Sequence, residues 1–432
     1  MPADFRHLLH GPFVTFALLA TLGLAPAPTR AEEPPEPVPT LDDTLEAGDA
    51  DMPEPRRKLV AWNEFEGPWM TLRVGGGVLY EGATYAQDAA SERQFDLEPE
   101  AKFRDARFLL KGRFPKFARS VTWSTGLMYD GPTDSWLLRE TGVMVDVPEL
   151  WGQIFVGRTK EGFSLNKVMS GYSGWTMERA TINDATVPIL ADGVKWLGYL
   201  PDRGVLWNLG FYGDWLSEGQ SFSSYHRQYV ARLLWLPIRS EAERTLLHLG
   251  VNFRYGEVAH GELRLRSRPE AFPAPYFVDT GAFPADDTRM ASLEAYYRPR
   301  NWLVGGEYFV QEADSPTQGD PVSHGGDLVL SWLATGEVRT YNTRGAYFNA
   351  ISPNRTVFEG GPGAWELVAR FSYIDLDSDP VRGGKFWRFT PMANWHLSDN
   401  LRLSVVYGYG HLDRFELAGV TQFFQSRLQF VF

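Results

Sequence analysis

Arginine and lysine side chains recur at positions where polar residues alternate with apolar ones. A guanidinium or an ammonium group binds phosphate or carboxylate oxygens through charge-assisted hydrogen bonds. Acidic residues in the same register are fewer, namely Asp105, Asp214, Glu307 and Glu366. We therefore expect the basic set to attract anions through weak, repeated contacts. The basic set consists of Arg107, Lys111, Arg113, Arg232, Arg244, Arg254, Arg370, Arg388, Arg402 and Arg427.

Covalent chemistry finds less support in the sequence. An enzyme that attacks with a nucleophile needs a base positioned beside it. The candidate bases His226, His248 and His396 share the register of the basic set, but His248 has no serine in register nearby. The chain has no cysteine, which excludes disulfides and thiolate metal sites. We expect no catalytic residue, no metal and no cofactor.

Strands are the elements that must position these side chains, because apolar and polar residues alternate with a period of two. In one segment Trp365, Leu367 and Phe371 share a face, and Glu366 and Arg370 share the other. A basic side chain that faces lipid near the middle of a bilayer costs roughly 2 to 4 kcal/mol. If the apolar face contacts lipid, the basic set must line a water-filled lumen.

Short and long connections alternate along the chain, as they do in outer-membrane barrels. Short turns fall at residues 115–116, 148–149, 201–203, 237–243, 299–300 and 398–400. Longer connections lie near residues 81–101, 130–135, 158–191, 216–224, 257–288, 312–325, 376–383 and 411–420. Eight long loops predict an all-β fold, a closed sixteen-stranded antiparallel transmembrane β-barrel. The count requires residues 336–362 to form a long turn, since a hairpin there would raise it to eighteen.

The C-terminal residues form the most specific local pattern. Phe424, Leu428, Phe430 and Phe432 share one face of a predicted last strand. This pattern resembles the terminal strand by which the barrel assembly machinery recognises outer-membrane barrels. In a soluble sheet, a free apolar edge of this kind would invite aggregation. We interpret the four residues as an assembly signal.

The first sixty residues differ in composition from the rest. Residues 1–31 indicate a cleavable signal peptide, because their apolar run is too short to span a membrane and ends in small residues. Residues 32–60 are predicted to be a disordered periplasmic tail, since residues 32–55 are Pro-rich and carry nine acidic residues and no basic one. Residues 61–432 are predicted to form the barrel, located in the outer membrane of a Gram-negative bacterium.

Three of the longest connections carry bases that would narrow a wide barrel if they folded inward. Apolar anchors such as Phe163 and Trp175 favour inward folding of the first group. For the second group, an exposed loop that contacts lipopolysaccharide phosphates is an equal alternative. The groups are Arg158, Lys160, Lys167 and Arg179; then Arg264, Arg266 and Arg268; then Arg339, Arg344 and Arg355.

Several of these segments resemble the phosphate-selective porin O/P family. Residues 157–165, Gly-Arg-Thr-Lys-Glu-Gly-Phe-Ser-Leu, are similar to its Gly-Arg-Phe-Lys-Glu-Pro-Phe segment, with Gly162 in place of Pro, and Glu178-Arg179 resembles the Glu-Arg pair that follows. Residues 334–337 resemble its Leu-Thr-Gly-Glu. Residues 363–372 resemble its Gly-Ala-Trp-Glu-Leu-Ala-Ala-Arg-Tyr-Ser, and residues 392–397 its Gly-Leu-Asn-Trp-Tyr-Leu.

The resemblance runs in patches from about residue 100 to the C-terminus. It implies a trimeric sixteen-stranded barrel, narrowed by inward-folded loops and a periplasmic turn, in which Arg and Lys side chains pass anions along. The lysines that give some members their phosphate preference do not align with this chain. Phosphate selectivity therefore does not follow from the resemblance.

Together these patterns predict an outer-membrane porin for passive diffusion of small hydrophilic solutes, with a preference for small anions such as phosphate or other oxyanions. The nearest alternative is a general or sugar-type diffusion porin, in which aromatic side chains stack on the solute. A barrel enzyme and a purely structural or adhesive barrel are further alternatives. Expected partners are outer-membrane lipid, lipopolysaccharide, small anionic solutes, the barrel assembly machinery and further copies of the chain in a homotrimer; no nucleic acid is expected.

Overall fold

The computed structural model of the chain describes residues 63–131, 134–216 and 224–432. The predicted signal peptide (residues 1–31) and the predicted acidic tail (residues 32–60) lie outside the described residues. All described residues fall in the larger of two compact units, residues 40–432. No helix among them is long and apolar enough to cross a membrane.

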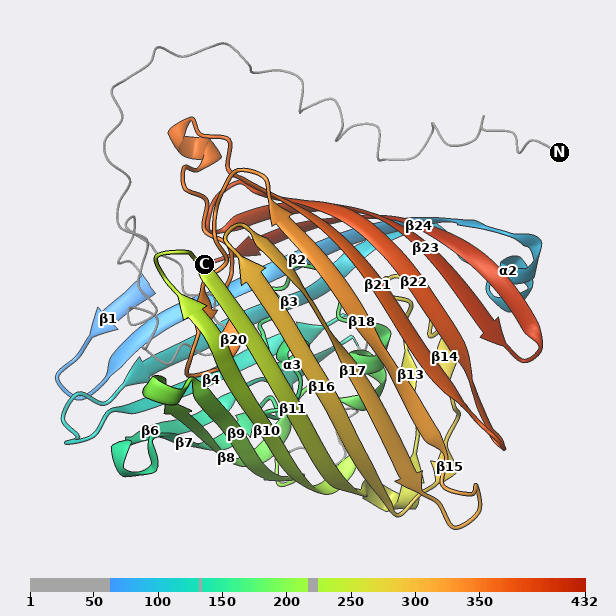
Figure 1. Cartoon of the computed structure of the whole chain (residues 1–432), viewed down its shortest axis with the longest axis horizontal. Coiled ribbons are helices and arrows are strands. Elements are labelled where there is room, and N and C mark those ends of the chain that lie inside the picture. The colour runs from blue at the N-terminus through green and yellow to red at the C-terminus, as the bar shows by residue number, and fades with distance from the viewer. Residues whose placement is uncertain (1–62, 132–133, 217–223) are drawn as a thin grey trace. The chain divides into compact units, whose positions relative to one another are not determined.

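Sixteen antiparallel strands form a closed ring, which confirms the predicted fold and strand number (Figure 1). The ring closes where β2 (Thr71–Gln87) pairs with β24 (Leu417–Val431). One strand of the ring is interrupted, because β5 (Ser135–Leu138) and β6 (Thr141–Val147) both pair with β4 (Val121–Asp130). The short β1 (Glu64–Glu66) pairs with the start of β2. The remaining strands are β3 (Glu100–Arg113), β7 (Gly152–Thr159), β8 (Ala191–Leu200), β9 (Val205–Gly213), β10 (Tyr225–Ser240), β11 (Thr245–Val258), β16 (Asp287–Pro299), β17 (Trp302–Asp314), β18 (Val322–Leu333), β21 (Ala364–Ser378), β22 (Val381–His396) and β23 (Leu401–Arg414).

Side chains alternate between the two faces of the wall, as a strand period of two requires. In β21, Trp365, Leu367 and Phe371 are exposed on the outer face, whereas Glu366 and Arg370 are buried on the inner face. An empty barrel would leave its inner side chains in water. Because Glu366 and Arg370 are buried, other parts of the chain must fill the lumen beside them.

The last strand shows the same alternation. Phe424, Leu428 and Phe430 of β24 are exposed on the outer face, and the rings of Phe430 and Phe432 stack with centroids 6.1 Å apart. Gln425 and Arg427 are buried on the inner face. Phe424, Leu428 and Phe430 of the predicted assembly signal therefore share the outer face of the last strand, and Phe432 stacks on Phe430 at its end.

The long turn between β18 and β21 (residues 334–363) decides the strand count. It contains β19 (Tyr341–Asn342) and β20 (Tyr347–Phe348), which pair with each other in a sheet of their own, followed by the 3-10 turn η7 (Val357–Glu359). The turn does contain a hairpin, but this hairpin does not join the wall. The expectation that a hairpin here would give eighteen strands is therefore wrong, and sixteen holds.

The other connections follow the predicted alternation only in part. The long connections predicted near residues 376–383 and 411–420 are instead two-residue turns, at 379–380 and 415–416, because the flanking strands extend farther than expected. Two of the short turns contain the 3-10 segments η4 (Pro148–Leu150) and η5 (Pro201–Arg203). The longer loops lie at the opposite end of the strands, which is the external end of a barrel with short periplasmic turns. These loops contain α2 (Ala89–Gln94), α3 (Leu165–Val168), α4 (Thr181–Thr186), η6 (Ala259–Gly261), β12 (Glu262–Leu263), β13 (Arg266–Ser267), β14 (Val278–Asp279) and β15 (Phe283–Pro284).

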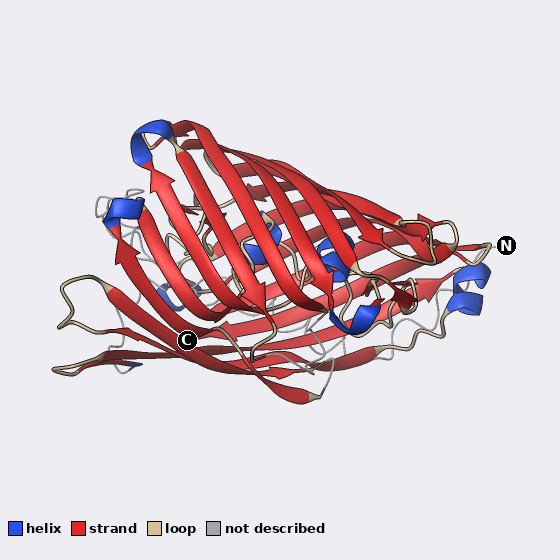
Figure 2. Ribbon diagram, turned by 90° about the horizontal axis from the view of Figure 1, so that it is seen from below, coloured by secondary structure: helices blue, strands red, loops and turns tan. Residues whose placement is uncertain are grey.

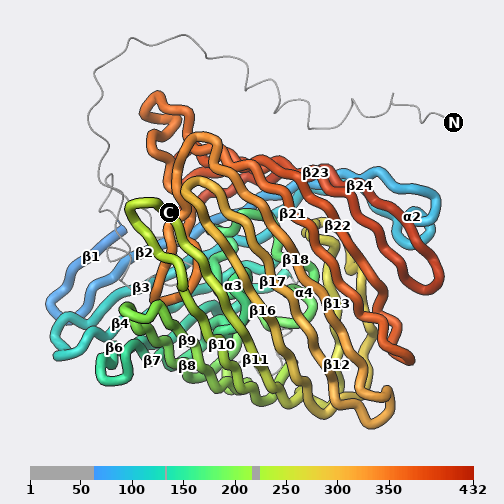
Figure 3. Tube along the Cα trace, in the orientation of Figure 1, coloured from blue at the N-terminus to red at the C-terminus, as the bar shows by residue number. Residues whose placement is uncertain are grey.

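Two loops and the long turn fold into the lumen and fill much of it. We call residues 160–190 the third loop and residues 259–286 the fifth loop. One buried cluster packs Phe163 of the third loop and Phe277 of the fifth loop with wall side chains, and another packs Trp175 of the third loop against Phe348 of the long turn and Tyr296 of the wall. Figure 2 shows short helices enclosed by the strands, and Figure 3 shows α3 and α4 behind the front wall.

Candidate pore constriction

The wall holds the start of α3, where the third loop crosses the lumen. The Ser164 hydroxyl accepts a hydrogen bond from the amide N–H of Lys167 at 3.3 Å and donates one to Glu307 of β17. Glu307 also accepts from the amide N–H of Asn166 at 2.8 Å and from the Tyr296 hydroxyl at 3.1 Å. Ser164 has a φ of 68°, which is uncommon for a residue other than glycine. Glu307 thus fixes both the cap and the first turn of α3.

Six of the ten predicted wall bases fasten segments that fold into the lumen. Each of the six is an arginine that donates a hydrogen bond to a backbone carbonyl of such a segment. Buried carbonyls need partners, and a guanidinium group offers five N–H donors in a rigid fork. Four of them bind carbonyls of the third loop, namely Arg254 (Thr186), Arg370 (Glu178), Arg402 (Gly174) and Arg427 (Met177). Arg388 binds the carbonyl of Pro269 in the fifth loop, and Arg232 binds that of Ala346 in the long turn.

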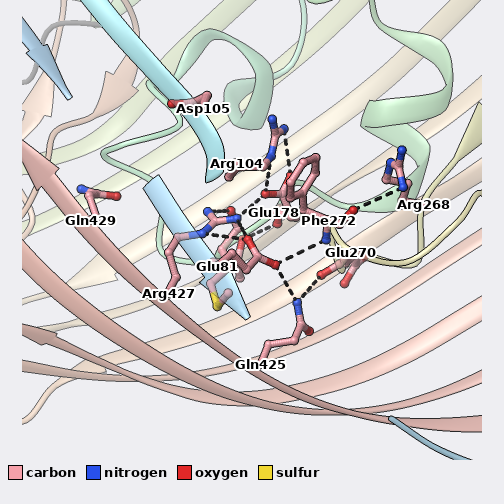
Figure 4. Close-up of polar contacts among 12 residues, drawn as sticks. Glu81, Arg104, Asp105, Glu178, Arg268, Glu270, Phe272, Gln425, Arg427 and Gln429 are labelled. Atoms are coloured by element: carbon pink, nitrogen blue, oxygen red, sulfur yellow. Dashed lines mark hydrogen bonds and ion pairs between the residues drawn. The ribbon is translucent and has the colours of Figure 1, made fainter. Parts of the chain in front are cut away.

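Acidic side chains neutralise several of these arginines. Arg427 contacts Glu81 of β2 and Glu178 of the third loop, and Glu178 also accepts a hydrogen bond from Arg104 at 3.0 Å (Figure 4). Glu81 in turn accepts a bond from the amide N–H of Phe272 in the fifth loop at 3.4 Å. This network ties both inner loops to the seam where β2 meets β24.

Elsewhere the wall repeats this pairing. Arg232 binds Glu294 at 2.7 Å with both side chains fully buried, and Arg370 pairs with Glu270 of the fifth loop. Because these charges are matched one to one, these arginines contribute less field to the lumen than their number suggests.

Three bases of the third loop line a narrow cavity of about 60 Å³, together with Arg107 of β3. These bases are Lys160, Lys167 and Arg179. Arg179 donates to the backbone carbonyls of Asn166 at 2.7 Å and Met169 at 3.0 Å, and the Lys167 ammonium group lies 3.5 Å from a backbone carbonyl. Among the described residues, neither Lys167 nor Arg179 has a carboxylate within ion-pair distance. Their charge remains available to an ion in the cavity.

Shared lining residues connect this cavity with two others. A cavity of about 40 Å³ has Arg107 and Arg179 in common with it. A much larger cavity, of about 540 Å³, opens toward the short turns and has Lys160 in common with it. The narrow part of the described lumen therefore lies around Arg107, Lys160 and Arg179, which we call the constriction.

On the third loop, the three basic side chains that line the narrow cavity outnumber the two acidic ones, Glu178 and Asp184. Burial lowers the pKa of Lys160 well below its usual range, and burial together with the Arg179 charge lowers the pKa of Lys167 to about 7. Burial and the neighbouring Arg107 lower the pKa of Arg179 to about 10. An anion between these groups would relieve their mutual repulsion.

Three of the predicted residues lie elsewhere than expected. Arg158 was expected in an inward loop, but it lies in β7 on the same outer side as Val156 and pairs with Asp192 at 2.7 Å. Asp192 also accepts a hydrogen bond from the amide N–H of Leu216. Arg244 follows the register of the wall, yet it is exposed in the turn before β11. Asp214 lies just beyond β9 and contacts His226 at 2.9 Å. For Arg244 and Asp214 the alternation was extended past the end of a strand, whereas the predicted loop began too early at Arg158, because β7 continues to Thr159.

The remaining predicted bases are divided between anchors and cavity walls. Arg339 of the long turn binds Glu366 at 2.7 Å and the carbonyl of Ser173 at 2.9 Å, so it is an anchor. Arg344 faces Asp146 at 3.8 Å and lines the large cavity together with Lys111 and Arg113.

The bases of the fifth loop and of the outer part of the long turn lie farther from the constriction, with one exception. Arg268 lines the 60 Å³ cavity. Both Arg266 and Arg268 lie over the ring of Tyr276. Arg264 pairs with Asp279 at 2.5 Å, and the exposed Arg355 donates to the carbonyl of Glu359.

Sequence reasoning missed several lumen residues. Arg104 faces the lumen beside Asp105 because a bulge opposite Leu79 and Tyr80 breaks the alternation of β3. Arg139 lines the narrow cavity from the break between β5 and β6. Glu294 and Lys195 do follow the alternation of their strands, so a stricter use of the period-two pattern would have found them.

A catalytic arrangement does not form around the histidines. His248 is buried between the Tyr341 hydroxyl at 2.7 Å and Glu294 at 3.2 Å. His396 lies near Glu366 at 3.6 Å, and His226 is exposed near Asp214. Within the described part of the chain, no group of side chains has the makeup of a metal site.

The closed sixteen-stranded ring and the inner loops define the class of protein, an outer-membrane barrel of the porin type. OmpT, an outer membrane protein of Vibrio cholerae, superposes with a TM-score of 0.54 at 11% identity, over 85% of this chain and 99% of that one. The anion-selective porin from Comamonas acidovorans gives a TM-score of 0.53 at 12% identity, over 84% and 100%. At such low identity the likeness concerns the fold alone.

The sequence itself shows the family. The family model for phosphate-selective porin O and P matches residues 82–432, so the chain belongs to this family and the predicted resemblance is confirmed. Porin O of Pseudomonas aeruginosa is 23% identical over 249 residues, which cover 50% of this chain and 55% of that protein. An uncharacterised protein of Caulobacter vibrioides is 30% identical over 169 residues, covering 38% of this chain and 34% of that protein.

The chain thus matches only about a third to a half of the length of these two curated relatives. Family and fold together place the protein in the outer membrane of a Gram-negative bacterium, as predicted.

Proposed function

We propose that the protein is a diffusion pore of the outer membrane that prefers small anions. The observation that carries this proposal is the pair Lys167 and Arg179, whose charges line a cavity of about 60 Å³ and are held by backbone carbonyls. An anion that passes would exchange part of its hydration for these donors. Since each contact is weak and several follow one another, binding does not stop conduction.

The lining of the constriction favours anions over sugars. Sugar pores use aromatic faces on which the solute stacks, and we expected such rings to discriminate the two functions. Among the described residues, the side chains that line the cavities of about 60 and 40 Å³ include none that is aromatic. The buried rings Trp175 and Tyr296 pack against each other and Phe348 instead of facing either cavity.

The proposal extends to selectivity, to the assembly and to the absence of catalysis. A solved structure of Vibrio cholerae OmpT is a trimer form, and the Comamonas acidovorans porin is anion-selective; both support a trimeric, anion-preferring pore here. Outer-membrane lipid and lipopolysaccharide would surround the barrel, and Phe424 to Phe432 would be read by the assembly machinery. We propose no enzymatic activity and no phosphate specificity.

Reversal potentials of the purified protein in planar bilayers under a KCl gradient test the proposal. We expect chloride to be more permeant than potassium. Arg179→Gln should lower the permeability ratio about fivefold, because one unit charge acts with roughly 1 kcal/mol across a lumen of this kind. Arg119→Gln, which removes an exposed turn arginine paired with Glu149, is the matched control. A cation-selective wild type, or an unchanged ratio in Arg179→Gln, would contradict the proposal.

A further inference from the structure

The large cavity on the periplasmic side has more room than a small inorganic anion needs. Its volume of about 540 Å³ lies within the range of roughly 300 to 1,000 Å³ typical of pockets that hold organic ligands. The cavities at the constriction, of about 60 and 40 Å³, are far smaller. A solute with a bulky apolar body would therefore fit on the periplasmic side and stop at the constriction.

Apolar side chains from three separate parts of the chain line this cavity. Phe155 of β7 and Leu197 of β8 come from the wall, Val168 from α3 and Tyr347 from the hairpin of the long turn. The ring of Phe155 lies over Gly142, where a Cβ atom would come within 2.4 Å of the ring. Gly142 thus lets the ring lie flat along the wall. The result is a slot between the wall on one side and the two inner segments on the other.

A basic group lies directly beside this apolar surface. Lys195 is the cross-strand neighbour of Phe155, and its ammonium nitrogen lies 5.1 Å from the centroid of the Phe155 ring. The same nitrogen donates a hydrogen bond to the Thr159 hydroxyl at 2.6 Å, which holds it over the ring. A carboxylate bound to Lys195 would place an attached ring next to Phe155 and Leu197.

The charge of the whole cavity also favours an anion. Six basic and four acidic residues line it. The lining therefore combines a net positive charge with an apolar patch. An inorganic anion uses only the first of these features, whereas an aromatic carboxylate uses both.

We propose that this slot is a binding site for small aromatic carboxylates that arrive from the periplasmic side, with Lys195 holding the carboxylate and Phe155 and Leu197 the ring. A bound molecule blocks the pore, because its ring is too large for the constriction. The inference rests on the proposed function, since it assumes an anion-conducting lumen.

Block of the chloride current by benzoate tests this site in the wild-type protein. Benzoate, acetate and the uncharged benzamide are added to one side of a bilayer at a time, and a biotin tag in the external loop at residues 315–321 marks the orientation. From the periplasmic side, we expect benzoate to halve the current at a concentration at least about tenfold below that of acetate, because burying a phenyl ring favours binding by one tenfold step or more. Benzamide should not block, and external benzoate should block far less.

Two variants separate the parts of the site. Phe155→Ala should bring the benzoate and acetate values close together, and Lys195→Gln should weaken block by both. Phe108→Ala truncates a ring on the outer face of β3 and is the matched control, with block unchanged. Because Phe155→Ala alters a buried side chain, each variant is first compared with wild type in chloride conductance, and Lys195→Gln with intact Phe155 tests the site independently.

The outcomes distinguish this inference from the proposed function. Equal block by benzoate and acetate in an anion-selective pore, or equal block from both sides, overturns the site and leaves the pore function standing. A cation-selective pore overturns the proposed function itself. Loss of the benzoate preference in Phe108→Ala would also overturn the assignment, because that ring lies outside the lumen.

Discussion

At the scale of single residues, the arginines and lysines inside the barrel fall into two groups with different roles, one on the wall and one on the third loop. Arg232, Arg388 and Arg427 donate to carbonyls of the inner segments, so their fork geometry serves as a clamp. Lys167 and Arg179 come from the loop itself and face the narrow cavity. Clamping uses the donors that an anion would need. The preference for anions is therefore expected to depend on the loop bases more than on the wall arginines.

The charge of Lys167 should make selectivity depend on pH. With a pKa lowered to about 7 by burial and Arg179, Lys167 is charged in roughly a tenth of molecules at pH 8 and in roughly nine tenths at pH 6. The chloride-to-potassium permeability ratio should therefore rise as the pH falls between these values. Lys167→Met should remove most of this dependence, while Lys116→Met in an exposed turn should retain it. The same pH slope in wild type and Lys167→Met would refute the assignment.

The clamping arginines should matter for stability. Arg232→Met leaves Glu294 buried without its guanidinium partner and the Ala346 carbonyl without a donor. Removing one partner of a buried ion pair typically costs about 3 to 5 kcal/mol. We expect urea unfolding in lipid vesicles to show a loss of this order. Arg119→Met, at an exposed pair, should unfold as the wild type does, and an unchanged Arg232→Met would show that the pair is not needed.

At the scale of elements, the third loop is positioned by polar contacts at its start and by apolar packing farther along. Only four residues form α3, which is too short to be stable without its surroundings. Glu307 accepts hydrogen bonds from the Ser164 hydroxyl and the Asn166 amide N–H. The carbonyl of Asn166 in turn accepts a hydrogen bond from Arg179. A single wall carboxylate thus determines where the basic groups of the constriction lie.

Substitution of Glu307 should separate positioning from charge. Glu307→Ala removes the acceptor of the Ser164 hydroxyl and of the Asn166 amide, and we expect larger fluctuations of the single-channel current and a permeability ratio closer to one. Glu307→Gln removes the charge but retains an acceptor for the Asn166 amide, and should keep the current steady. If Glu307 acted through its charge alone, both variants would raise anion preference equally. That result, read from reversal potentials and current noise, would exclude a positioning role.

At the scale of the whole molecule, the wall and its contents are built by different interactions. Backbone hydrogen bonds between neighbouring strands close the wall, whereas the contents are held by buried rings and clamps such as Arg339. The hairpin of the long turn belongs to the contents only, because its strands pair with each other. It should therefore be removable without opening the barrel.

Deletion of residues 341–348 tests this separation. The amide N–H of Asn349 donates to the carbonyl of Thr340 at 3.0 Å, so a short Gly-Gly link can replace the hairpin. We expect a folded barrel, seen as unchanged β-sheet circular dichroism, with a larger single-channel conductance because Tyr347 no longer narrows the periplasmic cavity. Wild-type conductance in a correctly folded deletion variant would contradict the placement of the hairpin in the lumen. Loss of the β-sheet signal would mean that the wall depends on it.

The sequence by itself determined the barrel, its strand number, its end strand and the inner face of most strands. Alternation along a strand is a local pattern, and a charged side chain on the lipid-facing side is costly. Residues such as Arg370, Arg402 and Phe430 could be assigned to a face on that ground alone. Their roles could not be assigned, since Arg427 meets Glu178 across 249 residues of chain. Only the tertiary structure decided which bases clamp a loop and which line the path, where a bulge turns Arg104 inward, and that Arg158 is paired on the outer side. These outcomes depend on contacts between segments that are distant in the sequence, and a period-two pattern carries no information about such contacts.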